Sequence, residues 1–157
     1  MPPRETSLTT ALTLAALVLI AGPAAATDFM PDDAGLMWAY AGDQDGAWTL
    51  AVDGQQLVGG ETTTAYRFEY DPVGEDYDFF GHYFFTRGAD GAVLYHGSLR
   101  DDGLALSYDP PLVWMPGDPV PGETTTTESE QFGDLEGTGP SSPVSYEVTV
   151  VGQVGLT

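Results

Sequence analysis

The chain has 157 residues, with 24 Asp and Glu against four Lys and Arg, so its formal net charge at pH 7 is −20. A field of that sign repels nucleic acid and anionic membrane surfaces, which excludes both as partners. There is no cysteine, which excludes disulfides and thiol chemistry and leaves packing to stabilise the fold.

The N-terminal segment has the order of an export signal. Arg4 precedes an apolar run over 11–21, and small residues follow as far as Ala26. This order predicts a secretory signal peptide over 1–26. The run is too short to span a membrane, which takes about 20 apolar residues. We therefore expect an exported protein, periplasmic or extracellular, with no membrane insertion after signal removal and a single β domain over 27–157.

Alternation of apolar and polar residues runs through this domain. In "TTTAYRFEY" one side of the chain carries Tyr66 and Phe68, and the other carries Ala65 and Arg67. The same period of two recurs over 36–40, 48–52 and 144–150 and is typical of antiparallel strands. Glycine and aspartate pairs punctuate these runs as hairpin turns do. The pattern predicts an all-β fold, an antiparallel sandwich or partly closed barrel of about eight or nine strands.

Three segments differ from this rhythm. The stretch 109–122 is dense in proline, which lacks the ladder donor, so it is predicted as a crossing segment that tucks 112–114 against the core. "ETTTTESE" at 123–130 is predicted as an exposed edge strand that its glutamates protect from aggregation. "EGTGPSSP" at 136–143 is predicted as a flexible loop.

A weak internal repeat relates 29–108 to 114–157, with the second copy incomplete. The opening pattern resembles a group of uncharacterised bacterial exported proteins that begin with "PL..G..W.Y" and carry a "YDPPL"-like segment. The matching residues here are Phe29, Pro31, Gly35, Trp38, Tyr40 and 108–112. The resemblance implies export and carries no assigned activity. The second copy departs from the pattern, since Thr125 and Thr127 stand where the tryptophan and tyrosine belong.

Two histidines decide whether general-base chemistry is available, because the chain has no other side chain suited to it near neutral pH. In a hairpin around "GADG", a two- or four-residue loop places His82 and His96 on opposite faces. Only a three-residue loop or a bulge would bring them together. We expect opposite faces, and with no catalytic residue assigned the chain is predicted not to be an enzyme.

A cluster of acids raises the question of calcium. "YDPVGEDYD" holds Asp71, Glu75, Asp76 and Asp78 on a predicted loop, which offers enough oxygens for a weak calcium site. A solvated acidic loop is the alternative. No other cofactor is expected.

The most unusual stretch is "FFGHYFF", 79–85, which is aromatic on both faces. One interpretation is a central strand covered by a second sheet and by the proline-dense segment. The other is a groove for an apolar or sugar ligand, or for a partner chain, lined by Phe80, Phe84 and Tyr95.

Three functions follow from these observations. The first is a non-catalytic exported β domain, and the second is a binding or carrier module for an apolar ligand or partner chain on the aromatic face. The third is a hydrolase that uses a pair of carboxylates, for which no particular pair stands out.

Overall fold

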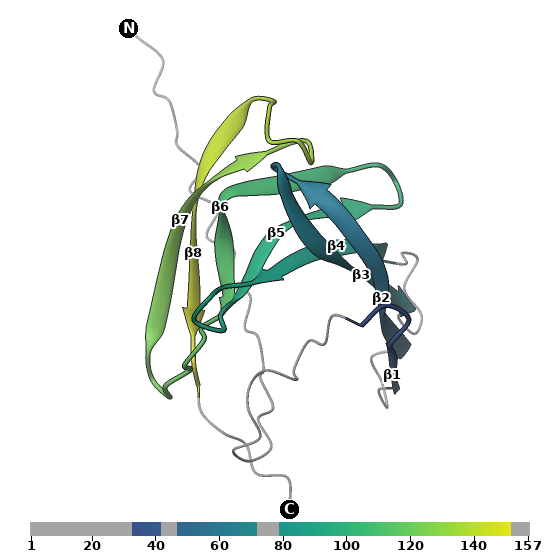
Figure 1. Cartoon of the computed structure of the whole chain (residues 1–157), viewed down its shortest axis with the longest axis horizontal. Coiled ribbons are helices and arrows are strands. Elements are labelled where there is room, and N and C mark those ends of the chain that lie inside the picture. The colour runs from purple at the N-terminus through teal and green to yellow at the C-terminus, as the bar shows by residue number, and fades with distance from the viewer. Residues whose placement is uncertain (1–32, 42–46, 72–78, 152–157) are drawn as a thin grey trace, which may run out of the picture.

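The structure is a computed structural model that describes residues 33–41, 47–71 and 79–151. These residues form eight strands and no helix (Figure 1). The strands are β1 (Met37–Ala41), β2 (Ala47–Val58), β3 (Glu61–Asp71), β4 (Phe79–Arg87), β5 (Val93–Arg100), β6 (Ala105–Met115), β7 (Thr124–Phe132) and β8 (Ser141–Thr149). The predicted signal peptide over 1–26 lies outside the described residues.

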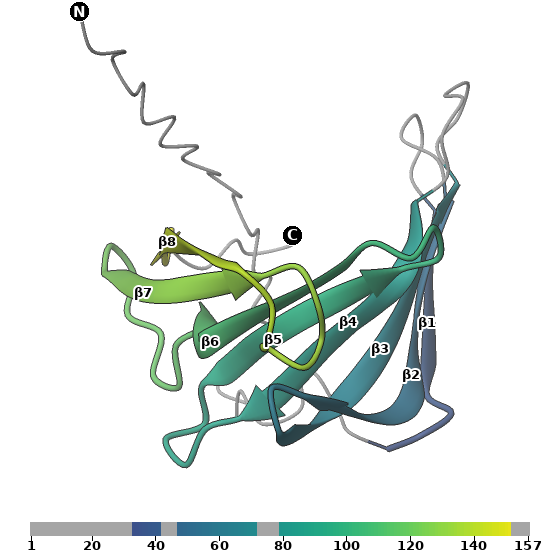
Figure 2. The same cartoon turned by 90° about the horizontal axis from the view of Figure 1, so that it is seen from above.

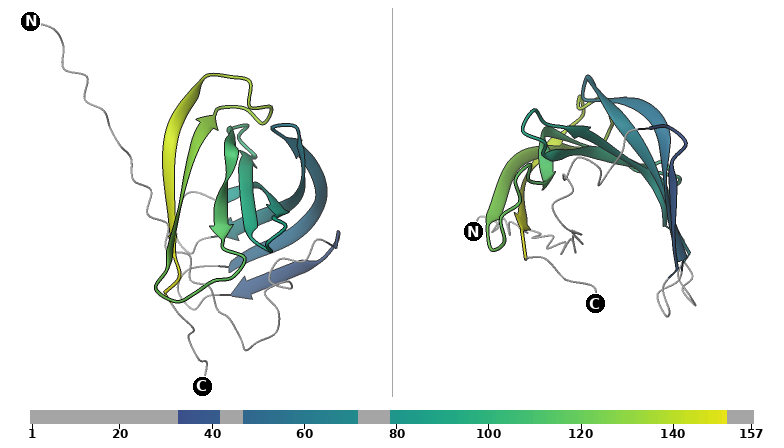
Figure 3. Two further views of the ribbon diagram at one scale, coloured as in Figure 1. Left: turned by 60° about the vertical axis from the view of Figure 1, so that its left-hand side comes forward. Right: turned by 60° about the horizontal axis from the view of Figure 1, so that its bottom comes forward.

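All eight strands belong to one antiparallel sheet, in the order β1 to β8, so each strand pairs only with its neighbours in the chain. The strand direction turns steadily across the sheet (Figure 2), as the twist of neighbouring strands requires. The sheet curls into an arch with β1 and β2 in one limb and β7 and β8 in the other (Figure 3). The prediction of an all-β antiparallel fold is confirmed, and the sheet is single and not closed into a barrel.

The main core lies on the inner side of the arch, which we call the concave face. Its buried members come from β2 to β6 and from β8, and they can meet only inside the curve. They are Val52, Tyr66, Phe85, Val93, Tyr95, Leu112, Met115 and Tyr146. The alternation predicted for 65–68 is confirmed, because Tyr66 lies in this core while Ala65 lies on the other face.

A smaller core lies on the outer side of the sheet, the convex face. It consists of Val58, Ala65 and Phe84, with Leu99 and Leu135 packed against them. The segment 133–140, between β7 and β8, folds back over this face. Gly59 N donates to Leu135 O at 2.8 Å, and Ser107 Oγ donates to Asp134 O at 2.6 Å. The convex face of β4 is therefore covered at Phe84 by this returning segment.

The prediction for the proline-dense segment is wrong in its first half, because β6 runs through Pro110 and Pro111. Residues 108–111 bulge out of the pairing with β5, so the ladder there needs no donor from a proline. Side chains of β7 form hydrogen bonds with the backbone of this part of β6. Ser129 Oγ donates to Pro110 O at 2.7 Å, and Val113 N donates to Thr127 Oγ1 at 3.2 Å. Beyond the bulge the chain does pack against the core, through Leu112.

The predicted edge strand is also placed differently. Segment 123–130 forms most of β7, which pairs with β6 on one side and with β8 on the other. Within the described residues the ends of the sheet are β1 and β8. In the same part of the chain, no helix is long and apolar enough to cross a membrane.

Candidate binding face

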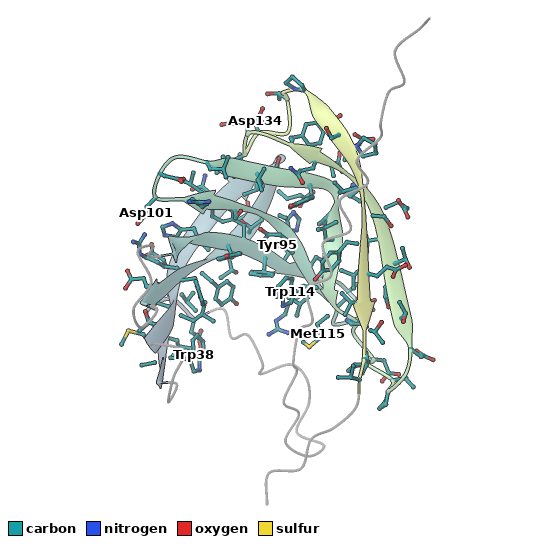
Figure 4. All side chains as sticks on the ribbon, turned by 180° about the vertical axis from the view of Figure 1, so that it is seen from behind. Trp38, Tyr95, Asp101, Trp114, Met115 and Asp134 are labelled. Carbon is teal, nitrogen blue, oxygen red and sulfur yellow. The ribbon has the colours of Figure 1, made fainter. Side chains whose placement is uncertain are left out.

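The concave face carries a continuous layer of aromatic rings with Tyr95 at its centre. The Tyr95 ring centroid lies 5.3 Å from Phe85, 5.5 Å from Tyr108 and 5.9 Å from Trp114. Phe85 extends the layer toward the β1 limb through Tyr66, at 5.6 Å. Tyr95 and Trp114 lie on the inner side of the arch, between its two limbs (Figure 4). Rings in such tilted and edge-to-face contacts gain more stabilising free energy than the burial of their apolar area alone supplies.

Several rings of this layer are covered only in part. Tyr83, Tyr108 and Trp114 are partly buried, whereas Tyr95 among them is 9% exposed. The layer thus combines buried rings with rings that keep part of their surface accessible. Ligand sites are commonly concave and mostly apolar, with a few polar groups that fix orientation.

Tyr146 supplies the one buried polar atom that lacks a partner among the described side chains. It comes from β8 and lies nearly parallel to Trp114, with 6.5 Å between the ring centroids and 9° between the planes. The residue is 9% exposed, and its hydroxyl is buried without a hydrogen bond. An unsatisfied buried hydroxyl costs about 1–3 kcal/mol of stability. Such a group in a native fold calls for an explanation.

The phenols of this face hold their protons. Burial raises the pKa of Tyr83 to about 12, although the charge of Arg100 opposes the shift. Burial also raises the pKa of Tyr95, Tyr108 and Tyr146, and neighbouring phenols add to the effect at Tyr95 and Tyr146. Each of these hydroxyls is therefore a neutral hydrogen-bond donor throughout the physiological range of pH.

The structure does not bring the three predicted ligand residues onto one face. Tyr95 lies on the concave face, whereas Phe84 is 2% exposed and lies on the convex face. Phe80 lies in β4, and its side chain is outside the described part. The expectation that Phe84 and Tyr95 share a face is wrong, and the β4–β5 turn gives the reason.

That turn has a three-residue loop, because Gly88 N donates to Ala92 O at 2.8 Å. Residue numbers of one parity then share a face across the hairpin, and Phe85 pairs with Tyr95. The next pair is Phe84 with Gly97, so His96 is an extra residue in a β-bulge.

The same loop and bulge overturn the prediction for the histidines, which lie together on the convex face. His82 stacks on Phe84 at 6.4 Å, and its Nε2 lies 2.8 Å from Asp53 Oδ2. His96 is buried, with its Nε2 2.8 Å from Thr86 Oγ1. Each histidine thus has a separate structural partner. No group of three or more metal-binding side chains occurs in the part of the chain that the structure describes.

Most of the predicted calcium site lies outside the described residues. Glu75, Asp76 and Asp78 belong to the segment 72–78, and Asp71 ends β3 with its side chain undescribed. Weak calcium binding there stays a prediction.

The convex face also carries an ion network centred on Arg67. Its Nη1 and Nη2 donate to the carboxylate of Asp101 at 3.2 and 2.8 Å, and its Nε donates to Glu69 at 2.9 Å. The hydrogen bonds from Arg67 lower the pKa of Asp101. The network ties the β5–β6 turn to β3. Exposed pairs of this kind contribute little to stability because solvent screens them, so we assign the network no more than a structural role.

Trp114 and Tyr146 are two of the residues of this face that the sequence did not assign to a site. Trp114 was expected against the core, and Tyr146 alternates with Val144 and Val148 as an inward side chain should. Their contact across the arch depends on the curl of the sheet, which brings β8 over β6.

A scan against protein-family models finds no match, and searches of curated proteins and of solved structures also find none. The resemblance to uncharacterised exported proteins therefore stays a prediction.

Proposed function

We propose that the chain is a non-catalytic exported domain that binds an apolar small molecule on the concave face. The partly buried rings of Tyr83, Tyr108 and Trp114 carry this proposal, because they pack against the buried aromatic core of the concave face and keep part of their own surface accessible. Rings so placed offer a large apolar contact area at little cost in side-chain entropy.

The absence of catalysis rests on the side chains that are available. The chain has neither cysteine nor lysine. Both histidines have partners on the convex face, away from the aromatic layer. A hydrolase would need two carboxylates about 5–10 Å apart in a cleft, and the aromatic layer is built from Tyr, Trp, Phe and aliphatic side chains.

Binding of the uncharged dye N-phenyl-1-naphthylamine to residues 27–157 tests the proposal, because the dye fluoresces when it enters an apolar site. We expect saturable binding at one site, and we expect Trp114→Leu to weaken it at least tenfold. Leu104→Ala is the control, because Leu104 is an exposed leucine in the β5–β6 turn (49%). Circular dichroism confirms that each variant is folded. Absence of saturable binding by the unmodified domain would refute the proposal.

A further inference from the structure

Two methionines of the described part lie in opposite surroundings. Met37 is 67% exposed, whereas Met115 is 5% exposed and belongs to the core of the concave face. The chain has no cysteine, so methionine thioethers are the only sulfur atoms that a peroxide can oxidise. The exposure of each thioether therefore decides where that reaction takes place on the folded chain.

The position of Met37 in the sheet explains its exposure. Within the described residues β1 is an end of the sheet, so Met37 has a neighbouring strand on one side only. The residue opposite it on β2 is Ala51, whose short side chain covers little. Trp38 packs against the concave core, so the alternation of β1 turns the Met37 side chain to the other face.

Met115 is shielded by the fold. It ends β6 opposite Val93, which is 2% exposed, and both belong to the main core. A peroxide reaches its sulfur only when the fold opens. An oxygen added to this sulfur would also be a buried polar atom, which costs stability unless it finds a hydrogen-bond donor. The same oxygen on Met37 would be hydrated.

We propose that Met37 is an oxidation site of the folded domain, at which a peroxide converts the thioether into a sulfoxide without loss of the fold. A lone pair of the sulfur forms a bond to one peroxide oxygen as the O–O bond breaks. The sulfur is oxidised by two electrons. The transferred oxygen gives its proton to the departing hydroxide, which leaves as water. The site lies away from the concave face, so this proposal does not depend on the function proposed above.

The two methionines form a matched pair for the test, because each adjoins a tryptophan, in Met37–Trp38 and Trp114–Met115. Residues 27–157 are treated with hydrogen peroxide and then cleaved before aspartate, which separates the two methionines and also Met30. Mass spectrometry measures the sulfoxide in each peptide, and fragmentation distinguishes it from oxidised tryptophan.

In the folded domain we expect Met37 to be oxidised at least about tenfold faster than Met115, because Met115 reacts only from opened molecules. In urea that unfolds the domain, the two rates should become equal, since the neighbouring residues are alike. A smaller difference in the folded domain would overturn the proposal. A difference that persists in urea would also overturn it, because the exposure in the fold would then not be the cause.

Stability provides the second readout. After complete oxidation of Met37, the domain should unfold at the same urea concentration as the untreated domain. Met37→Leu, given the same treatment, is the control for oxidation at other residues. A lower midpoint for the oxidised domain than for this treated control would overturn the claim that the fold tolerates the sulfoxide.

Oxidation of Met37→Leu in urea places the sulfoxide on Met115 instead. After refolding, we expect a lower urea midpoint than for the same variant oxidised while folded, because the added oxygen lies in the core. Equal midpoints for these two preparations would overturn the contrast between the exposed and the shielded methionine.

Discussion

Gly97 shows how closely two strands of this sheet approach each other. It sits in the bulge of β5, opposite Phe84 and beside Ser107. A Cβ at this position would overlap the carbonyl oxygen of Leu106, and the backbone φ is 156°. A backbone atom cannot rotate out of the way as a long side chain can. Gly97 is therefore a requirement of the bulge.

We expect Gly97→Ala to lower the free energy of unfolding by about 1–3 kcal/mol, the range for overpacking a filled interior. Urea denaturation measures the change. Gly133→Ala is the control, because nothing lies within 4 Å of a Cβ built there, and it should leave the midpoint nearly unchanged. Equal effects of the two substitutions would show that the close contact is not a constraint.

His96 makes stability depend on pH. Burial lowers its pKa below the ordinary value of 6.5, although Glu61 opposes the shift. As pH falls below 6.5, the unfolded chain takes up this proton before the folded chain does. The contribution of His96 to stability is therefore complete above pH 6.5 and is lost as pH falls from there toward the folded-state pKa.

Urea denaturation between pH 8 and pH 5 tests this dependence. We expect the free energy of unfolding to fall on acidification. For His96→Gln we expect this free energy to fall less steeply, because glutamine does not titrate and can still form a hydrogen bond with Thr86. Parallel curves for the two proteins would contradict the role assigned to His96.

At the scale of elements, the sequence predicted which side chains of one strand share a face, but it did not predict the register between neighbouring strands. The period of two in 65–68 depends only on the strand itself, so the sequence indicates which side chains go together. The relation between β4 and β5 depends on one residue in the loop and one in the bulge, and each reverses the parity. The prediction used two- and four-residue loops, and this choice put Phe84 and Tyr95 on one face.

The binding face was partly predictable for the same reason. Tyr95 was identified because the predicted hairpin set it beside the aromatic stretch 79–85. Tyr146 was not identified as part of a site, because its contact with Trp114 joins β8 to β6 across the curve. Curvature of a sheet is a property of its bulges and twist summed over many strands. A pattern of apolar residues within one strand carries no information about the curvature of the whole sheet.

The segment between β7 and β8 is a structural cover, and Leu135 is its apolar contact with the convex core. We expect Leu135→Ser to lower the free energy of unfolding by about 1–2 kcal/mol, since a partly buried leucine loses its apolar contacts. Leu57→Ser serves as the comparison, because Leu57 is 60% exposed. Thermal unfolding of the two variants should differ clearly, and similar midpoints would mean that the segment adds little.

At the scale of the whole molecule, the net charge of −20 acts against the compact state through self-repulsion. Two of the few cations already pair with acids, Arg67 with Asp101 and Arg100 with Asp102. Screening should therefore weaken repulsion more than it weakens attraction.

We expect the melting temperature at pH 7 to rise as sodium chloride increases from about 20 mM to about 500 mM. The same titration near pH 4, where the carboxyl groups are close to half protonated, should give a much smaller rise. A melting temperature that falls with salt at pH 7 would show that the ion pairs outweigh the repulsion.

The strand order β1 to β8 has a consequence for how the chain reaches this fold. Every ladder joins strands that follow one another in sequence, so a hairpin can form without waiting for a distant part of the chain. All-β proteins usually fold slowly because remote segments must first find each other. Here the loop-closure entropy is lost in small steps, one turn at a time, and the arch can grow strand by strand from any hairpin that forms first.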